Sequence, residues 1–280
     1  MIDSVIQSHE GPRLPVDAHV HFHREQLVES TLDAAAKNFA RFGAPTAPLL
    51  GALLLAQGSR EHVFEQLAET ASCGTWRLLS LPLEPQTIVA SSRGRQIAII
   101  CGRQIRCELG LEVLALGTTT CYPDGSALED TLDRVRADGA LAVVPWAFGK
   151  WTGRAGALVR DLFGTSMPDS LFAGDNGGRL RIWGMPKLLQ VASRAGFRLL
   201  PGSDPFPFGA DYRRVGAFGF RAPITPDPSM PWQSLRDGLA DTGFIPEPYG
   251  RALNPFRFFF NQTWVQLYNR GVRHQRHRYM

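Results

Sequence analysis

The sequence predicts an α/β fold, a TIM-like barrel of parallel strands covered by helices, and three observations support this fold class. Strand-like and helix-like stretches alternate along roughly the first 200 residues, as is typical of βαβ units. About seven such strands in one domain favour a closed barrel over an open sheet. Polar side chains follow the first and last of these strands. A barrel of this type carries its chemistry at the carboxyl ends of its strands.

The expected strands are short and largely apolar runs that read as buried. They are residues 14–20, 49–56, 75–81, 96–105, 112–117, 141–144, 171–174 and 198–200. The expected helices between them are residues 29–42, 59–72, 125–137, 153–163 and 185–195. Ser59 is a candidate N-cap with Glu61 and Glu65 in the early turns. Residues 125–137 carry acids early and arginines late, as the helix dipole favours.

The C-terminal part is expected to belong to the same domain as the barrel, which we place at residues 1–222. Residues 223–248 are rich in proline and predict an extended wrap. Residues 254–268 predict a helix opened by Asn-Pro, with Phe256, Phe259, Phe260, Trp264 and Leu267 near one face. We expect Phe256–Leu267 to dock on the barrel or on a partner subunit. Contact with an anionic membrane surface is the alternative.

Charge and targeting signals narrow the function classes. The net charge is +4, but residues 251–280 hold six Arg and no acid, so the remainder has 24 basic against 26 acidic residues. The basicity belongs to the tail, and we expect no nucleic-acid binding. The N-terminus lacks the apolar stretch of a signal peptide, and the apolar run at 47–56 is too short to span a bilayer. A cytoplasmic protein is expected.

The first strand ends in the motif that points most directly to chemistry, DAHVHFH over residues 17–23. Alternate side chains of a strand share a face, so His19, His21 and His23 can point the same way, with Asp17 beneath them. Two imidazoles at this spacing can chelate one divalent ion such as zinc, manganese or iron. The alternative is a polar strand end with solvated histidines.

The last strand ends in PGSDPFPFG, which places Asp204 at the same mouth as the histidines. Its carboxylate could bind a metal ion or accept a proton from a metal-bound water. An ordinary turn is the alternative, because Gly, Ser, Asp and Pro all favour turns.

Three basic residues follow other strand ends and are candidates for binding an anionic substrate. Lys150 and Arg154 follow residues 141–144, and Arg179 lies in the Gly-rich stretch DNGGR. Surface charge and an ordinary strand-to-helix loop are the alternatives.

Taken in order, the motifs resemble the polymerase and histidinol phosphatase (PHP) family of metal-dependent phosphoesterases. They are VDAHVHFH, IICGRQIRCELGLEVLALG, LAVVPWAFGKW, and LLPGSDPFPFG followed by VGAFGF, and they cover roughly residues 14–220. The resemblance implies a distorted (β/α)7 barrel with two or three divalent metals that activate a water for attack on phosphorus. His19 and His21 match the family's HxH, and Asp204 matches the Asp of its closing motif.

Several ligand positions of the family hold other residue types in this chain. The family has His at these positions, except for a bridging Glu at the position of Gln104. The substituted positions are Gln57, Gln104, Glu112, Phe206, and Trp146 or Pro145. The remaining clear candidates are His19, His21, Asp204 and Glu112, with Asp17, His23 and Gln104 as additional ones. This set suffices for one ion with an open position.

Three functions therefore remain open. The first is a PHP-like hydrolase of a small phosphorylated substrate, with one zinc, manganese or iron ion and Asp204 as ligand or base. The second is a degenerate PHP-like protein without a metal, acting as a binding or accessory subunit. The third is an amidohydrolase-type C–N hydrolase, for which the HxH strand is also suited.

Overall fold

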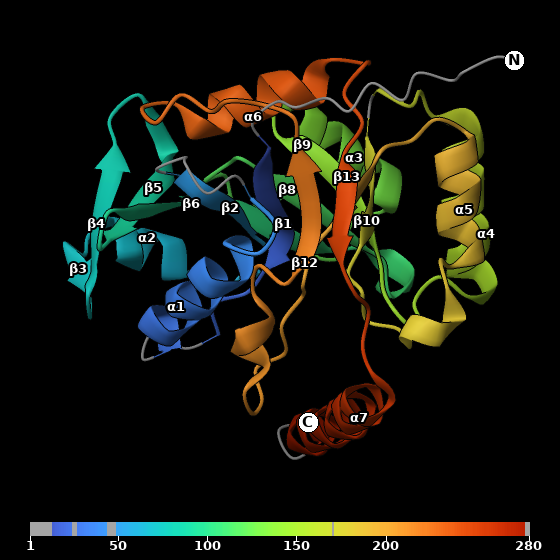
Figure 1. Ribbon diagram of the computed structural model, residues 1–280. Helices are drawn as coiled ribbons and strands as arrows, with labels where there is room; N and C mark the ends of the chain where they lie inside the picture. The colour runs from blue at the N-terminus through green and yellow to red at the C-terminus, as the bar shows by residue number, and fades with distance from the viewer. Residues whose placement is uncertain (1–12, 24–26, 44–48, 170, 278–280) are drawn as a thin grey trace, which may run out of the picture.

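The computed structural model describes residues 13–23, 27–43, 49–169 and 171–277, with α/β architecture (Figure 1). The strands are β1 (Leu14–Val20), β2 (Leu49–Leu55), β3 (Ser72–Cys73), β4 (Trp76–Leu81), β5 (Glu84–Ser92), β6 (Arg95–Ile100), β7 (Gly102–Arg106), β8 (Glu112–Leu116), β9 (Leu141–Trp146), β10 (Phe172–Asp175), β11 (Leu199–Pro201), β12 (Phe218–Ala222) and β13 (Glu247–Gly250). The α-helices are α1 (Val28–Phe39), α2 (Val63–Ala68), α3 (Leu128–Ala137), α4 (Gly153–Thr165), α5 (Lys187–Arg194), α6 (Pro231–Ala240) and α7 (Pro255–His277). Short 3₁₀ turns are η2 (Glu108–Gly110), η3 (Arg181–Trp183) and η4 (Asp211–Arg214).

The predicted barrel is wrong, because the described strands form two separate mixed sheets. One has eight strands in the order β13-β12-β1-β2-β6-β5-β4-β3, and the other has five in the order β11-β10-β9-β8-β7. Antiparallel neighbours interrupt the parallel order, since β5 pairs with β4 and β6, and β8 pairs with β7 and β9. Over the described ranges, an isolated bridge between Gln57 and Arg103 links the sheets, and no strand ladder closes them into a (β/α)7 barrel.

The single strand predicted at residues 96–105 is in fact two strands in different sheets. The chain leaves the eight-stranded sheet at Ile100 and enters the five-stranded sheet at Gly102. A Cβ atom at Gly102 would lie 2.4 Å from the carbonyl oxygen of Leu55 and 2.9 Å from that of Ala115. Glycine is therefore required where the backbone passes this closely between the two sheets.

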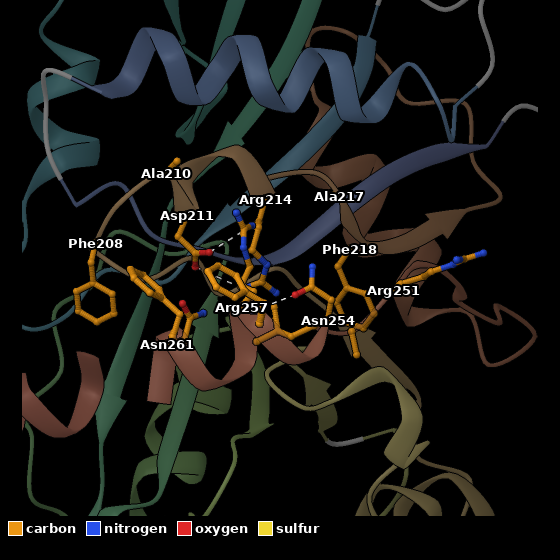
Figure 2. Close-up of a pocket in the computed structure, with 14 residues that line it drawn as sticks. Phe208, Ala210, Asp211, Arg214, Ala217, Phe218, Arg251, Asn254, Arg257 and Asn261 are labelled. Carbon is orange, nitrogen blue, oxygen red and sulfur yellow. Dashed lines mark hydrogen bonds and ion pairs between the residues drawn. The ribbon is translucent and has the colours of Figure 1, made fainter. Parts of the chain in front are cut away.

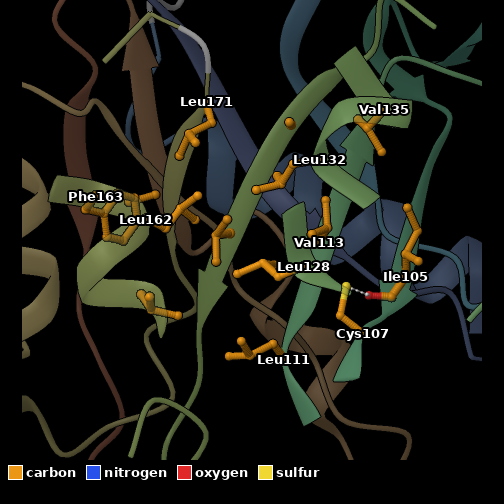
Figure 3. Packing of buried hydrophobic residues seen from close by; sticks show 14 of the residues in the cluster. Ile105, Cys107, Leu111, Val113, Leu128, Leu132, Val135, Leu162, Phe163 and Leu171 are labelled. Carbon is orange, nitrogen blue, oxygen red and sulfur yellow. Dashed lines mark hydrogen bonds between the residues drawn. The ribbon is translucent and has the colours of Figure 1, made fainter. Parts of the chain in front are cut away.

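Three buried clusters arrange the elements in layers. The helices α1 and α2 pack on one face of the eight-stranded sheet. A second cluster joins this sheet to the five-stranded one, for example through Val16 and Ala98 on one side and Val143 and Phe172 on the other. The third cluster lies between the five-stranded sheet and α3, α4 and α5 (Figure 3). Parallel strands covered on both faces explain the apolar runs in the sequence.

The C-terminal part holds more regular structure than the predicted wrap. Helix α6 crosses the body at the top of Figure 1 and adds Trp232, Leu235 and Leu239 to the cluster between the sheets. Helix α7 confirms the predicted helix and extends beyond it, lying below the body in the same view. Phe258 is buried against Leu180 and Leu253. The docking role of Phe256–Leu267 stays a prediction.

Five large apolar side chains of this segment reach solvent. They are Phe256, Phe259, Phe260, Trp264 and Leu267. None of the helices in the described part of the chain combines the length and apolar character that a membrane span requires.

A carboxylate from a distant strand caps helix α6. Met230, which precedes the helix, provides no side-chain cap. Buried Glu84, at the start of β5, accepts hydrogen bonds from the backbone N–H groups of Trp232 at 3.0 Å and Gln233 at 2.7 Å. A negative charge at this end also complements the helix dipole.

We expect Glu84→Gln to lower the free energy of unfolding by about 1–3 kcal/mol, because one acceptor oxygen becomes a donor facing an N–H group and the charge is lost. Urea denaturation measures the change. Glu69→Gln, at an exposed position, is the matched control and should change stability by less than about 0.5 kcal/mol. Equal losses in the two variants would contradict the capping role.

Candidate metal centre

His19, His21 and Asp204 bring three ligand atoms together at the carboxyl ends of β1 and β11. The His19 and His21 Nε2 atoms are 3.2 Å apart. Asp204 Oδ1 lies 3.6 Å from the first and 3.4 Å from the second. The three atoms thus form a nearly equilateral triangle, and within the described chain these residues make up a group able to hold a metal ion.

The size of this triangle matches the coordination shell of a small divalent ion. An ion with tetrahedral bonds of about 2.0–2.1 Å places its ligand atoms about 3.3–3.4 Å apart. Imidazole nitrogen and carboxylate oxygen are ligands for zinc, manganese and iron. The side chains of His21 and Asp204 are 12% and 22% exposed, so the triangle can be reached from solvent.

Gln104 adds a fourth candidate ligand atom, an oxygen, at the same place. It lies in β7, and its Oε1 is 3.2 Å from His19 Nε2. A carboxamide oxygen can bind a cation but adds no charge. The site therefore has one carboxylate and two imidazoles, a set suited to a single divalent ion.

The backbone at Asp204 is strained and held in place by two contacts. Its φ is +42°, in the left-handed region that costs a non-glycine residue about 1–2 kcal/mol. Its N–H donates to the His19 carbonyl oxygen at 2.8 Å. The Asn176 Nδ2 donates to Asp204 Oδ2 at 2.8 Å, which leaves Oδ1 facing the histidines.

Asp17 lies beneath the histidines and supports them. Its Oδ1 accepts the N–H of Ser203 at 2.7 Å and that of His19 at 3.3 Å, and its Oδ2 accepts the N–H of Gly216 at 2.8 Å. Burial raises the pKa of Asp17 to about 6, and these hydrogen bonds limit the rise. Both oxygens are therefore occupied by the backbone.

His23 also supports the pair. Its Nε2 is 2.7 Å from the carbonyl oxygen of Pro205, and since a carbonyl only accepts, His23 carries its proton on this nitrogen. Its ring stacks on that of His21 with centroids 5.2 Å apart. This contact fixes the orientation of the His21 ring.

The titration of the three central residues follows from their burial and from one another. Burial lowers the pKa of His19, although the Asp204 carboxylate opposes the shift. Burial opposes charge on His21 too, but the hydrogen bond and charge of Asp204 outweigh it and raise that pKa. Burial alone would raise the pKa of Asp204, yet His19 and His21 hold it well below its usual range. Asp204 is therefore ionised. Its Oδ1 and the Nε2 atoms of His19 and His21 are directed at one point.

Glu112 and the predicted basic residues lie outside the triangle. Glu112 pairs with Lys150 at 2.5 Å, and Arg179 is buried in an ion pair with Asp175. Arg154 is exposed at the start of α4. Their assignments as metal ligand or substrate-binding residues stay predictions.

The residues that stand where the resemblance would place further ligands have other contacts. Gln57 accepts the N–H of Phe64 at 2.7 Å and so caps helix α2. Phe206 stacks on Phe208 with ring centroids 5.4 Å apart. The Arg179 guanidinium lies 5.8 Å from the ring centroid of Trp146.

Sequence reasoning missed the role of Asn176, which orients Asp204. The signal available was its position directly after the strand that ends at Asp175.

Comparison with known proteins establishes similarity of fold only. No family model matches the chain, and no curated protein matches it. Among solved structures, PsfC from Pseudomonas syringae PB-5123 matches with a TM-score of 0.54 and 15% identity, over 93% of this chain and 99% of that one. The lesion-specific endonuclease PfuEndoQ from Pyrococcus furiosus matches with a TM-score of 0.49 and 14% identity, over 84% of this chain and 57% of that one. The second match is too weak to support an inference.

We expect Asp17→Ala to lower the free energy of unfolding by about 2–5 kcal/mol. Three N–H groups lose their acceptor, at about 1–3 kcal/mol each. Burial of the charged carboxylate, which raises the pKa of Asp17 to about 6, costs the folded protein about 3 kcal/mol. The alanine variant avoids this cost, and the avoided cost offsets only part of the loss. Urea denaturation at pH 7 measures the difference, with exposed Asp161→Ala as control. A stability equal to that of the control would show that Asp17 does not hold the strand ends together.

Proposed function

We propose that the chain is a metal-dependent hydrolase that acts on phosphate esters with one divalent ion. The observation that carries the proposal is the triangle of His19 Nε2, His21 Nε2 and Asp204 Oδ1, whose edges of 3.2–3.6 Å fit a small divalent ion. When bound, such an ion supplies a Lewis acid and activates water as a nucleophile.

The residues of the centre support distinct roles. His19 is kept neutral by burial and is ready to bind a cation through Nε2. Asp204 serves as a ligand through Oδ1, because Oδ2 is occupied by Asn176. Gln104 adds a neutral oxygen beside His19. A small cavity lined by His21, His23, Phe206 and other residues adjoins the pair, and its volume of about 20 Å³ is enough for little more than a water molecule.

A phosphate ester is the proposed substrate class because the motifs resemble those of PHP phosphoesterases. Lys150, Arg154 and Arg179 remain the candidates for orienting the phosphate. A C–N hydrolase would use the same histidine pair, so substrate screening must distinguish the two. The alternative of a binding or accessory protein without a metal is supported by Gln104 and Gln57. These residues stand where PHP phosphoesterases have a charged or an imidazole ligand.

We expect the protein, purified without a polyhistidine tag, to bind about one equivalent of Zn²⁺ or Mn²⁺ per chain after metal removal and reloading. His21→Ala should lose at least about tenfold in affinity, since it removes one of three ligands. His62→Ala, at an exposed position on the edge of α2, is the matched control and should bind like the wild type. Elemental analysis and chelator competition measure both quantities. Less than a tenth of an equivalent in the reloaded wild type would refute the metal centre.

The reaction class is tested with the reloaded protein on phosphomonoesters, phosphodiesters and cyclic amides. Ester hydrolysis that requires metal and is lost in His21→Ala supports the proposal. Hydrolysis of amides alone would assign the C–N class instead. Metal binding without turnover of any substrate would reject the hydrolase and favour a binding protein.

We expect Gln104→Glu to tighten metal binding by about tenfold, because it adds a charged oxygen 3.2 Å from His19 Nε2. Chelator competition measures the affinity. Exposed Gln66→Glu in α2 makes the same chemical change elsewhere and should leave the affinity unaltered. An unchanged affinity in Gln104→Glu would show that this side chain does not face the ion.

A further inference from the structure

A second pocket lies between η4, the start of β12 and the residues that open α7 (Figure 2). Its volume is about 420 Å³, within the range of small-molecule sites. It shares no lining residue with the metal triangle. Its lining includes Asp211, Arg214, Arg257, Asn261, Phe218 and Phe260.

The charge in this pocket is unbalanced. Buried Asp211 is a single carboxylate facing two guanidinium groups. Its Oδ2 lies 3.5 Å from Arg214 Nη1, and its Oδ1 lies 3.5 Å from Arg257 Nη1. Its Oδ2 also accepts the N–H of Phe206 at 2.8 Å. One carboxylate shared at these long distances leaves several guanidinium N–H groups without a short contact.

Two buried donors in the pocket have no acceptor among the described residues. They are Arg214 Nη2 and Asn261 Nδ2. Arg214 is 8% exposed and Asn261 is 2% exposed. Buried donors without acceptors are rare and costly in folded proteins. Both belong to groups that an incoming oxyanion would satisfy.

The surroundings favour an organic anion over a bare ion. Phe208, Phe218, Phe256 and Phe260 line the pocket beside the charged groups. A neighbouring hollow shares Phe218 and Arg251 with it and is also lined by Arg179 and Arg181. Arg179 is paired with Asp175, but Arg181 and Arg251 add positive charge beside the pocket, which attracts anions.

We propose that this pocket binds a small organic oxyanion, a carboxylate or a phosphate ester. The oxyanion lies against Arg214, Arg257 and Asn261, and its apolar part packs against the phenylalanine rings. The site is independent of the metal centre, so the proposal does not require the hydrolase.

Isothermal titration of protein that has been freed of metal with a chelator and then dialysed free of the chelator tests the proposal with phenyl phosphate and benzoate, which share an aromatic ring and differ in their oxyanion. Benzyl alcohol is the neutral control. We expect saturable binding of one or both anions and none of the alcohol. Binding of phenyl phosphate alone assigns a phosphate ester, binding of benzoate alone assigns a carboxylate, and binding of both supports the shared class.

The variants locate the binding. Half-buried Arg257→Gln should weaken the affinity about tenfold or more, because it removes a charged donor. Exposed Arg160→Gln on α4 makes the same change elsewhere and should bind like the wild type. Asn261→Leu should also weaken binding but should raise the melting temperature of the free protein, because an apolar residue of similar size replaces an unsatisfied donor. A purely structural asparagine would lower that temperature when replaced.

Three results would overturn the proposal. The first is no saturable binding of either anion by the wild type. The second is equal binding of benzyl alcohol. The third is loss of binding in His21→Ala together with full binding in Arg257→Gln, which would place the anion at the metal triangle instead.

Discussion

The hydrogen bonds that the buried Asp17 carboxylate accepts are the interactions on which the candidate metal centre depends. It lies in β1 and accepts N–H groups from Ser203 and Gly216, which are 186 and 199 residues away in the chain. A carboxylate suits this place because it offers two acceptor oxygens and no donor. Its contacts draw the segment that carries Asp204 to the end of β1. The hydrogen bonds that complete the fold therefore also bring Asp204 Oδ1 to His19 and His21.

Strain at Asp204 is consistent with this support. A left-handed backbone at an aspartate persists only where surrounding contacts determine it, and here the His19 carbonyl oxygen and the Asn176 amide supply them. The result is a carboxylate whose Oδ1 is directed at two imidazole nitrogens. His19 Nε2, His21 Nε2 and Asp204 Oδ1 can all act as hydrogen-bond acceptors, and their lone pairs point toward one another. Because such lone pairs repel one another in a poorly solvated site, a proton or a metal ion is needed between them.

The sequence can predict those features of the candidate site that follow from the short-range periodicity of a strand. The alternation of a strand placed His19 and His21 on one face, and the end of the last predicted strand marked Asp204. Strand direction has no such local signature. Residues 84–92 mix polar and apolar side chains and are not predicted as a strand, so the antiparallel arrangement of β4, β5 and β6 is missed and a barrel is predicted. Long-range hydrogen bonds such as Glu84 to the start of α6 could not be predicted for the same reason.

The segment from Asp204 to Asp211 carries one acid at each end, and the two acids have different partners. Asp204 accepts a hydrogen bond from Asn176 and lies beside the imidazoles of His19 and His21, so its Oδ1 is placed to contact a cation at the triangle. Asp211 faces two guanidinium groups, so its surroundings hold more donors than one carboxylate can satisfy. The N–H of Phe206 between them donates to Asp211, which fixes the segment relative to η4. The proposed cation site and the proposed oxyanion site therefore lie at the two ends of one short segment of the chain.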